Sequence, residues 1–95
     1  MNIEIEKENK LAALFGALSE PNRIRIIKIL RDSDHELNCG EVSRLLQIAP
    51  STVSYHFKAL RQAGLTKTRQ QSQTKYLSLN METFNRYLPS FLDSL

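Results

Sequence analysis

Apolar residues recur at helical spacing in the first third of the chain. A first helix is expected at residues 7–18, where the i, i+3, i+4, i+7 pattern is carried by Leu11, Leu14, Phe15 and Leu18. A second helix is expected in PNRIRIIKILRD, because Pro21 fits the first turn of a helix and Ile24, Ile27 and Leu30 share one side.

Two more helical stretches, joined by the short connection QIAP, are expected between residues 40 and 63. Asn38 followed by Glu41 resembles a capping box at the start of the first stretch. Pro50 fits the first position of the second stretch, and Gly64 can end it because glycine takes the left-handed conformation cheaply. This order of helix, short turn and helix predicts a helix-turn-helix.

After Gly64 the pattern changes to a period of two. LTKTRQ and KYLSLN alternate around the polar stretch QSQT, which predicts a β-hairpin at about residues 65–79. A last helix is expected at 81–94, kinked or restarted at Pro89. Its apolar stripe comprises Phe84, Leu88, Phe91, Leu92 and Leu95. The fold class is therefore mostly α with a small β-hairpin, in the order α-α-α-α-β-β-α, a winged helix-turn-helix.

Length and composition predict one small domain spanning residues 1–95. A domain of this size leaves apolar surface uncovered, and oligomerisation is a common remedy. The single cysteine, Cys39, excludes an intrachain disulfide and fits a reducing compartment. Neither a signal peptide nor a membrane-spanning apolar run is apparent, so a cytoplasmic protein without membrane association is expected.

Charge is distributed unevenly along the chain. Residues 42–81 contain six Lys or Arg and no Asp or Glu, whereas the flanking segments are net acidic. A forty-residue basic stretch that coincides with a predicted helix-turn-helix and wing favours a polyanionic partner, namely double-stranded DNA.

The helix at 50–63 is expected to be the recognition helix. With Val53, Phe57 and Leu60 facing inward, its polar side chains can contact base edges and phosphates from the major groove. This DNA-binding set is Ser51, Thr52, Ser54, Tyr55, His56, Lys58 and Arg61, with His56 at the edge of the buried side. The hairpin can contact the backbone or minor groove through Arg69, Gln71, Gln73 and Lys75.

The stretches PNRIRIIKIL and STVSYHFKALRQAGL, followed by the hairpin, resemble the ArsR family of winged-helix repressors. The resemblance implies a homodimeric repressor that binds a pseudo-palindromic operator and is released by a signal. It also implies a dimer interface formed by the first and last helices. The residues expected there are Leu11, Leu14, Phe15, Phe84, Leu88, Phe91 and Leu92.

The effector of such a repressor is not indicated by the sequence. Metal-sensing members of the family often carry ELCVCD where this chain has ELNCGE, and one thiolate is too few for a tight thiophilic site. We therefore expect neither a metal nor another cofactor. Cys39 lies near a helix N-terminus, which permits a redox role without showing it.

Two other classes of function fit the sequence less well. A winged helix can serve as a protein-interaction module without specific DNA binding, although such a module should tolerate acids on the recognition helix. An enzyme is not expected, because Ser54 and His56 lie two residues apart on a helix and their side chains diverge.

Overall fold

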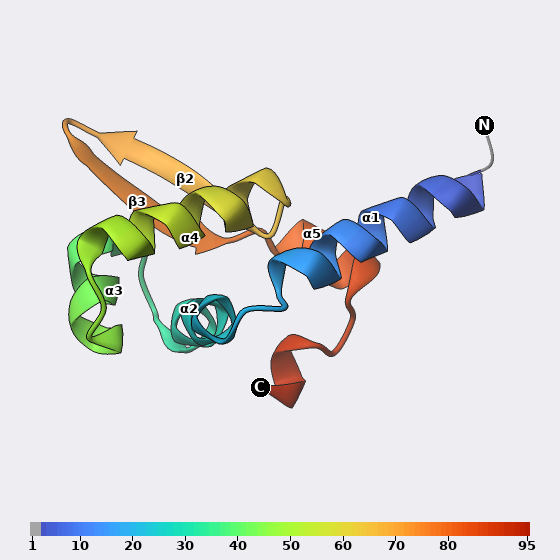
Figure 1. Cartoon of the computed structure of the whole chain (residues 1–95), viewed down its shortest axis with the longest axis horizontal. Helices are drawn as coiled ribbons and strands as arrows, with labels where there is room; N and C mark the ends of the chain where they lie inside the picture. The colour runs from blue at the N-terminus through green and yellow to red at the C-terminus, as the bar shows by residue number, and fades with distance from the viewer. Residues whose placement is uncertain (1–2) are drawn as a thin grey trace.

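The computed structural model describes residues 3–95 (Figure 1). Their elements are, in order, α1 (Ile3–Ala17), α2 (Pro21–Asp32), β1 (Leu37–Asn38), α3 (Cys39–Leu46), α4 (Pro50–Gln62), β2 (Thr66–Gln71), β3 (Thr74–Leu79), α5 (Met81–Tyr87) and the 3-10 helix η1 (Leu92–Ser94). The predicted winged helix-turn-helix is confirmed, with one additional short strand, β1. Within these residues no helix is both long and apolar enough to cross a membrane.

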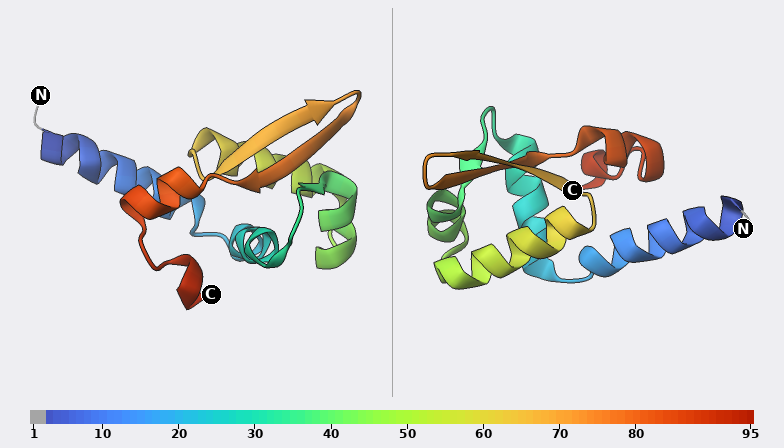
Figure 2. Two further views of the ribbon diagram at one scale, coloured as in Figure 1. Left: turned by 180° about the vertical axis from the view of Figure 1, so that it is seen from behind. Right: turned by 90° about the horizontal axis from the view of Figure 1, so that it is seen from above.

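The hydrophobic core lies between the helices and the inner face of the hairpin. Helix α2 packs against α3, α4 and β3, and α4 packs against β2, so the hairpin lies alongside α4 (Figure 2). The fully buried side chains at this junction include Ile26, Ile27, Val42, Val53, Leu60, Leu65 and Leu77. This arrangement holds α4 between a helical layer and the wing.

The helix-turn-helix forms without a glycine in its turn. Gln47 takes the left-handed conformation at the end of α3, with φ 57°. The Ser43 hydroxyl donates to the Ile48 carbonyl at 2.6 Å and holds the turn closed. Pro50 begins α4 as predicted, and Gly64, with φ 85°, follows its end.

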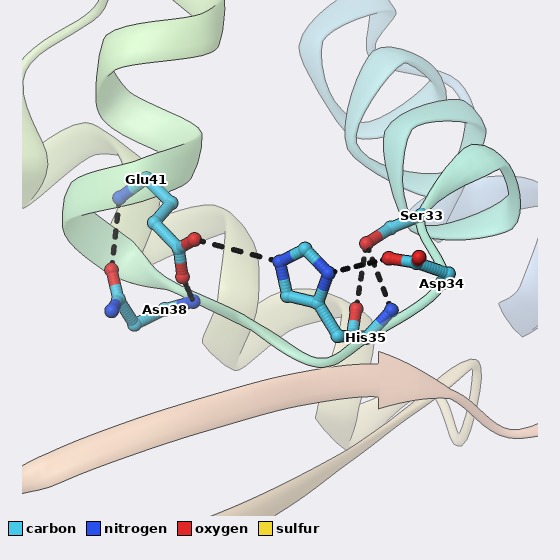
Figure 3. Close-up of polar contacts among 5 residues, drawn as sticks. All are labelled: Ser33, Asp34, His35, Asn38 and Glu41. Atoms are coloured by element: carbon cyan, nitrogen blue, oxygen red, sulfur yellow. Dashed lines mark hydrogen bonds and ion pairs between the residues drawn. The ribbon is translucent and has the colours of Figure 1, made fainter.

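A capping box orients α3 within the motif. Glu41 N–H donates to Asn38 Oδ1 at 2.9 Å, and Asn38 N–H donates to Glu41 Oε1 at 3.0 Å (Figure 3). The predicted capping box is thus confirmed. These two bonds satisfy backbone donors that the first turn of a helix otherwise leaves free.

Replacing Asn38 by alanine should lower the free energy of unfolding by about 1 kcal/mol, because it removes the cap acceptor. The melting temperature should fall by about 4–8 °C in a domain of this size. Thermal unfolding followed by circular dichroism measures the shift. Asn85→Ala, on the exposed side of α5, is the matched control. Equal shifts in both variants would contradict a specific role for the cap.

His35 extends the polar contacts in front of the capping box (Figure 3). Its Nδ1 lies 2.7 Å from Asp34 Oδ1, and its Nε2 lies 3.7 Å from Glu41 Oε2. The hydrogen bond to Asp34 is the main cause that raises the pKa of His35 above its ordinary value. The stabilisation from protonated His35 is therefore fully present below the ordinary pKa of histidine and is lost as pH rises through the raised pKa. Because the ring is exposed, this contribution is small.

The sheet has an additional strand at its edge. Strand β1 pairs antiparallel with β3 through Leu37 opposite Leu77, so the strand order is β1-β3-β2. The predicted hairpin is confirmed, and Gln71 lies opposite Thr74 across the two-residue loop. Ser72 supplies the left-handed residue of that loop, with φ 54°.

The last helix, predicted over 81–94 with a kink or restart at Pro89, is divided there into two shorter helices. Helix α5 ends at Tyr87, because Leu88 precedes Pro89 and the α conformation is disfavoured before proline. The chain turns at Ser90, with φ 69°, and continues into η1. An Arg31 guanidinium nitrogen donates to the Leu92 and Leu95 carbonyls, each at 2.6 Å, which ties this segment to α2.

The residues predicted for a dimer interface separate into two groups. Leu14, Phe84 and Leu88 are buried within the chain itself, so their assignment to an interface is wrong. The first half of α1 projects beyond the rest of the structure (Figures 1 and 2). Phe15 is 55% exposed, and the partly buried members are Leu11, Phe91 and Leu92.

Candidate nucleic-acid interface

One side of α4 is polar and exposed while the other is buried. Val53 and Leu60 are fully buried, which turns the opposite side of the helix outward. The exposed members of the predicted set are Ser51, Thr52, Ser54, Tyr55, Lys58 and Arg61. They include hydroxyl groups, which can hydrogen-bond to base edges, and two cations, which can pair with phosphates.

His56 is not part of this exposed side. It is 5% exposed, and its Nδ1 accepts a hydrogen bond from Arg23 Nε at 3.1 Å. The prediction that His56 contacts DNA is therefore wrong, because the helix turns its ring toward α2. Phe57 in contrast is only partly buried and borders the exposed side.

A cavity of about 600 Å³ lies between α4, the start of α3 and the wing. Lys58 and Arg61 line it from α4, and Lys75 lines it from β3. Its apolar lining comes from Phe57 and Tyr76. No carboxylate lines this cavity among the described residues. Three cations around a concave surface between a helix and a wing have the charge and shape that could accommodate a sugar-phosphate backbone.

The wing residues occupy different places on the hairpin. Lys75 and Gln73 line the cavity beside α4. Arg69 instead makes an ion pair with Glu36 (Nε to Oε1, 2.8 Å) and lies over the Tyr76 ring, with its guanidinium carbon 4.7 Å from the centroid. Arg69 also donates to Gln71 Oε1 at 3.0 Å. Arg69 and Gln71 thus form a second polar group on the hairpin, separate from the residues that line the cavity. The contacts with Glu36, Tyr76 and Gln71 hold the Arg69 side chain in place.

Cys39 lies at the joint between the two helices of the motif. Its Sγ is 3.3 Å from the Pro50 carbonyl oxygen and 3.6 Å from Ser54 Oγ, and the side chain is partly exposed. Within residues 3–95, no three His, Cys, Asp or Glu side chains gather in a group that could hold a metal ion.

Two contributors to this surface were missed from the sequence. Glu36, which is not among the predicted site residues, pairs with Arg69 across the sheet. Arg23, which is also not among the predicted site residues, contacts both His56 and Tyr55. All three contacts join residues 32 or 33 positions apart, so no local spacing signals them. The charge reversal between Glu36 and the acid-free wing is the one sequence feature that could have indicated the first pair.

The comparisons with known proteins match this architecture. The family model described as "Bacterial regulatory protein, arsR family" matches residues 20–68. The HTH-type transcriptional regulator YceK of Bacillus subtilis is 54% identical over 84 residues, which is 88% of this chain and 84% of that protein. The transcriptional activator HlyU of Vibrio cholerae is 37% identical over 82 residues, which is 84% of this chain and 74% of that protein.

Solved structures show the same fold. HlyU from Vibrio cholerae N16961 superposes with a TM-score of 0.68 at 33% identity, covering 83% of this chain and 80% of that one. The homodimeric winged helix-turn-helix DNA-binding domain of Mb0332 from Mycobacterium bovis superposes with a TM-score of 0.78 at 20% identity, covering 90% and 78%, and shows likeness of fold alone. The chain therefore belongs to the arsR family of bacterial regulatory proteins, and it is a winged helix-turn-helix transcriptional regulator and not an enzyme.

Proposed function

We propose that the protein is a homodimeric repressor that binds a pseudo-palindromic DNA operator. Helix α4 enters the major groove, and the wing contacts the backbone or the adjacent minor groove. The observation that carries this proposal is the exposed side of α4, which presents hydroxyls and cations beside a cavity lined by Lys58, Arg61 and Lys75. The proposed DNA-contacting set is Ser51, Thr52, Ser54, Tyr55, Lys58, Arg61, Arg69, Gln71, Gln73 and Lys75.

Two features support a dimer. Helix α1 projects from the body of the structure, and large apolar side chains on the terminal helices remain exposed, namely Ile5 at 50%, Phe15 at 55% and Met81 at 45%. A second copy would cover this apolar surface. Two copies related by a two-fold axis would also present two α4 helices to two half-sites, which is what a pseudo-palindrome requires.

The direct test is fluorescence anisotropy with a selected duplex and a scrambled control, each titrated across salt concentrations. We expect at least about a thousandfold preference for the selected duplex and a steep decrease of affinity with salt on both. A reporter gene placed behind the selected site distinguishes a repressor from an activator. Weak binding that is equal on both duplexes at low salt would instead favour the alternative, a protein-interaction module.

Replacing Glu36 by glutamine should increase affinity for DNA of any sequence. Glu36 pairs with Arg69 across the sheet and competes with DNA phosphates for its guanidinium, so removing this carboxylate lets Arg69 neutralise a phosphate more completely. The gain should be up to about eightfold near 0.1 M salt, with a salt slope steeper by about 0.9.

Glu82→Gln is the matched control, since it removes an equal charge from the exposed side of α5. Anisotropy on the scrambled duplex measures both variants. An equal gain from Glu82→Gln would show a net-charge effect and contradict the role given to Glu36.

A further inference from the structure

A buried histidine on α4 connects the recognition helix to α2. Arg23 Nε donates to His56 Nδ1 at 3.1 Å, and an arginine nitrogen can only donate. His56 Nδ1 must therefore be the acceptor, so the neutral ring carries its hydrogen on Nε2. That nitrogen lies 3.5 Å from Glu20 Oε2. The ring is 5% exposed, and both of its nitrogens have partners from the start of α2 or the residue before it.

Arg23 is held from several directions. Its backbone N–H donates to Glu20 Oε2 at 3.1 Å as part of the N-cap of α2. A terminal guanidinium nitrogen lies 3.5 Å from the Ala17 carbonyl oxygen at the end of α1. These contacts, together with the hydrogen bond to His56, restrict rotation of the Arg23 guanidinium.

The guanidinium so held lies against Tyr55. Its central carbon is 5.4 Å from the centroid of the Tyr55 ring, within the range of a cation–π contact. The His56 ring meets the same ring edge-on, with centroids 5.5 Å apart and planes at 61°. Tyr55 is nevertheless 63% exposed, so it is oriented by its neighbours while remaining open to a partner.

We propose that Arg23 and His56 are positioning residues for DNA recognition, which fix the Tyr55 ring in the orientation in which it meets the duplex. The inference rests on the proposed function, because an oriented Tyr55 matters to binding only if α4 contacts DNA. Orienting the ring before binding removes the entropic cost of ordering it in the complex. Selectivity for the operator, and not attraction to DNA in general, is the property that this arrangement improves.

The first test is a double-mutant cycle between Arg23 and Tyr55. Arg23→Lys keeps the charge but loses the planar fork that reaches His56 and Ala17 together. We expect about a five- to tenfold loss of affinity for the selected duplex, and a change within about twofold on the scrambled duplex. In a Tyr55→Leu background, Arg23→Lys should cost less than about twofold on either duplex.

The second test uses a matched pair at His56. Asn and Leu have nearly the same shape, and both leave the same space where the ring was. His56→Asn places an amide oxygen near the position of Nδ1 and can still accept from Arg23, whereas His56→Leu cannot. We expect His56→Asn to keep most of the selectivity and His56→Leu to lose it as Arg23→Lys does. Thermal unfolding establishes that each variant is folded at the temperature of the titration.

The outcomes separate this inference from the proposed function. If the wild-type protein does not discriminate between the duplexes, the proposed function and this inference are both contradicted. If it discriminates and Arg23→Lys lowers binding to both duplexes equally, or costs the same with and without Tyr55, the positioning role is overturned alone. Equal effects of His56→Asn and His56→Leu would likewise reduce His56 to a packing residue.

Discussion

Replacing Phe84 by alanine should lower the free energy of unfolding by about 3–5 kcal/mol, enough to unfold much of the protein. Phe84 is 1% exposed, and its ring stacks on Phe91 with centroids 6.3 Å apart. Truncation would remove most of these contacts and leave a cavity at the junction of α5 with the core. Urea unfolding at several protein concentrations measures the loss.

Phe15→Ala is the matched control. The same ring is removed, but from a side chain that is 55% exposed on α1. We expect little change in the stability of the single chain and a weaker dimer, seen as dissociation at higher protein concentration. The opposite pattern, a stable Phe84→Ala protein and a strongly destabilised Phe15→Ala protein, would contradict the division between core and interface described above.

Replacing Lys58 and Lys75 together by glutamine should weaken binding to all DNA about sixtyfold at 0.1 M salt. These lysines line the cavity between α4 and the wing from its two sides, and each is expected to neutralise one phosphate. Losing two such contacts should reduce the salt slope by about 1.8. Because phosphate contacts carry no sequence information, the preference for the selected duplex should remain.

The control for this pair is Arg25→Gln with Lys28→Gln, which removes two exposed positive charges from α2. Anisotropy titrations from low to moderate salt compare the two double variants on the selected and scrambled duplexes. The control should change the slope little. An equal decrease in both double variants would show that net charge governs binding and that the cavity beside the wing does not.

Local sequence signals predicted most of the secondary structure. The Asn38–Glu41 pair, Pro50 and Gly64 act within one or two turns of the chain, and each occupies the position expected of it. Strand β1 escaped prediction because two residues are too few to show a period. Pro89 was expected to kink or restart the last helix, and α5 ends just before it, at Tyr87, because the α conformation is disfavoured before proline.

Burial partners were harder to predict than burial itself. The apolar patterns of the first and last helices indicated correctly that Leu14, Phe84 and Leu88 leave water. Periodicity cannot, however, distinguish the core of one chain from an interface between two. His56 was placed at the edge of the buried side of α4, and in the fold it is 5% exposed and contacts Arg23 and Glu20. The Glu36–Arg69 and Arg23–His56 contacts depend on the tertiary fold, so spacing along the chain does not reveal them.

Selection of binding sites from a random duplex pool tests the central claim most directly. If two α4 helices read DNA as a symmetric dimer, the enriched sequences should contain two inverted half-sites. Their centres should lie about 10 base pairs apart, or a multiple of this helical repeat. A pool that remains random after repeated rounds at low and moderate salt would contradict sequence-specific recognition by this surface.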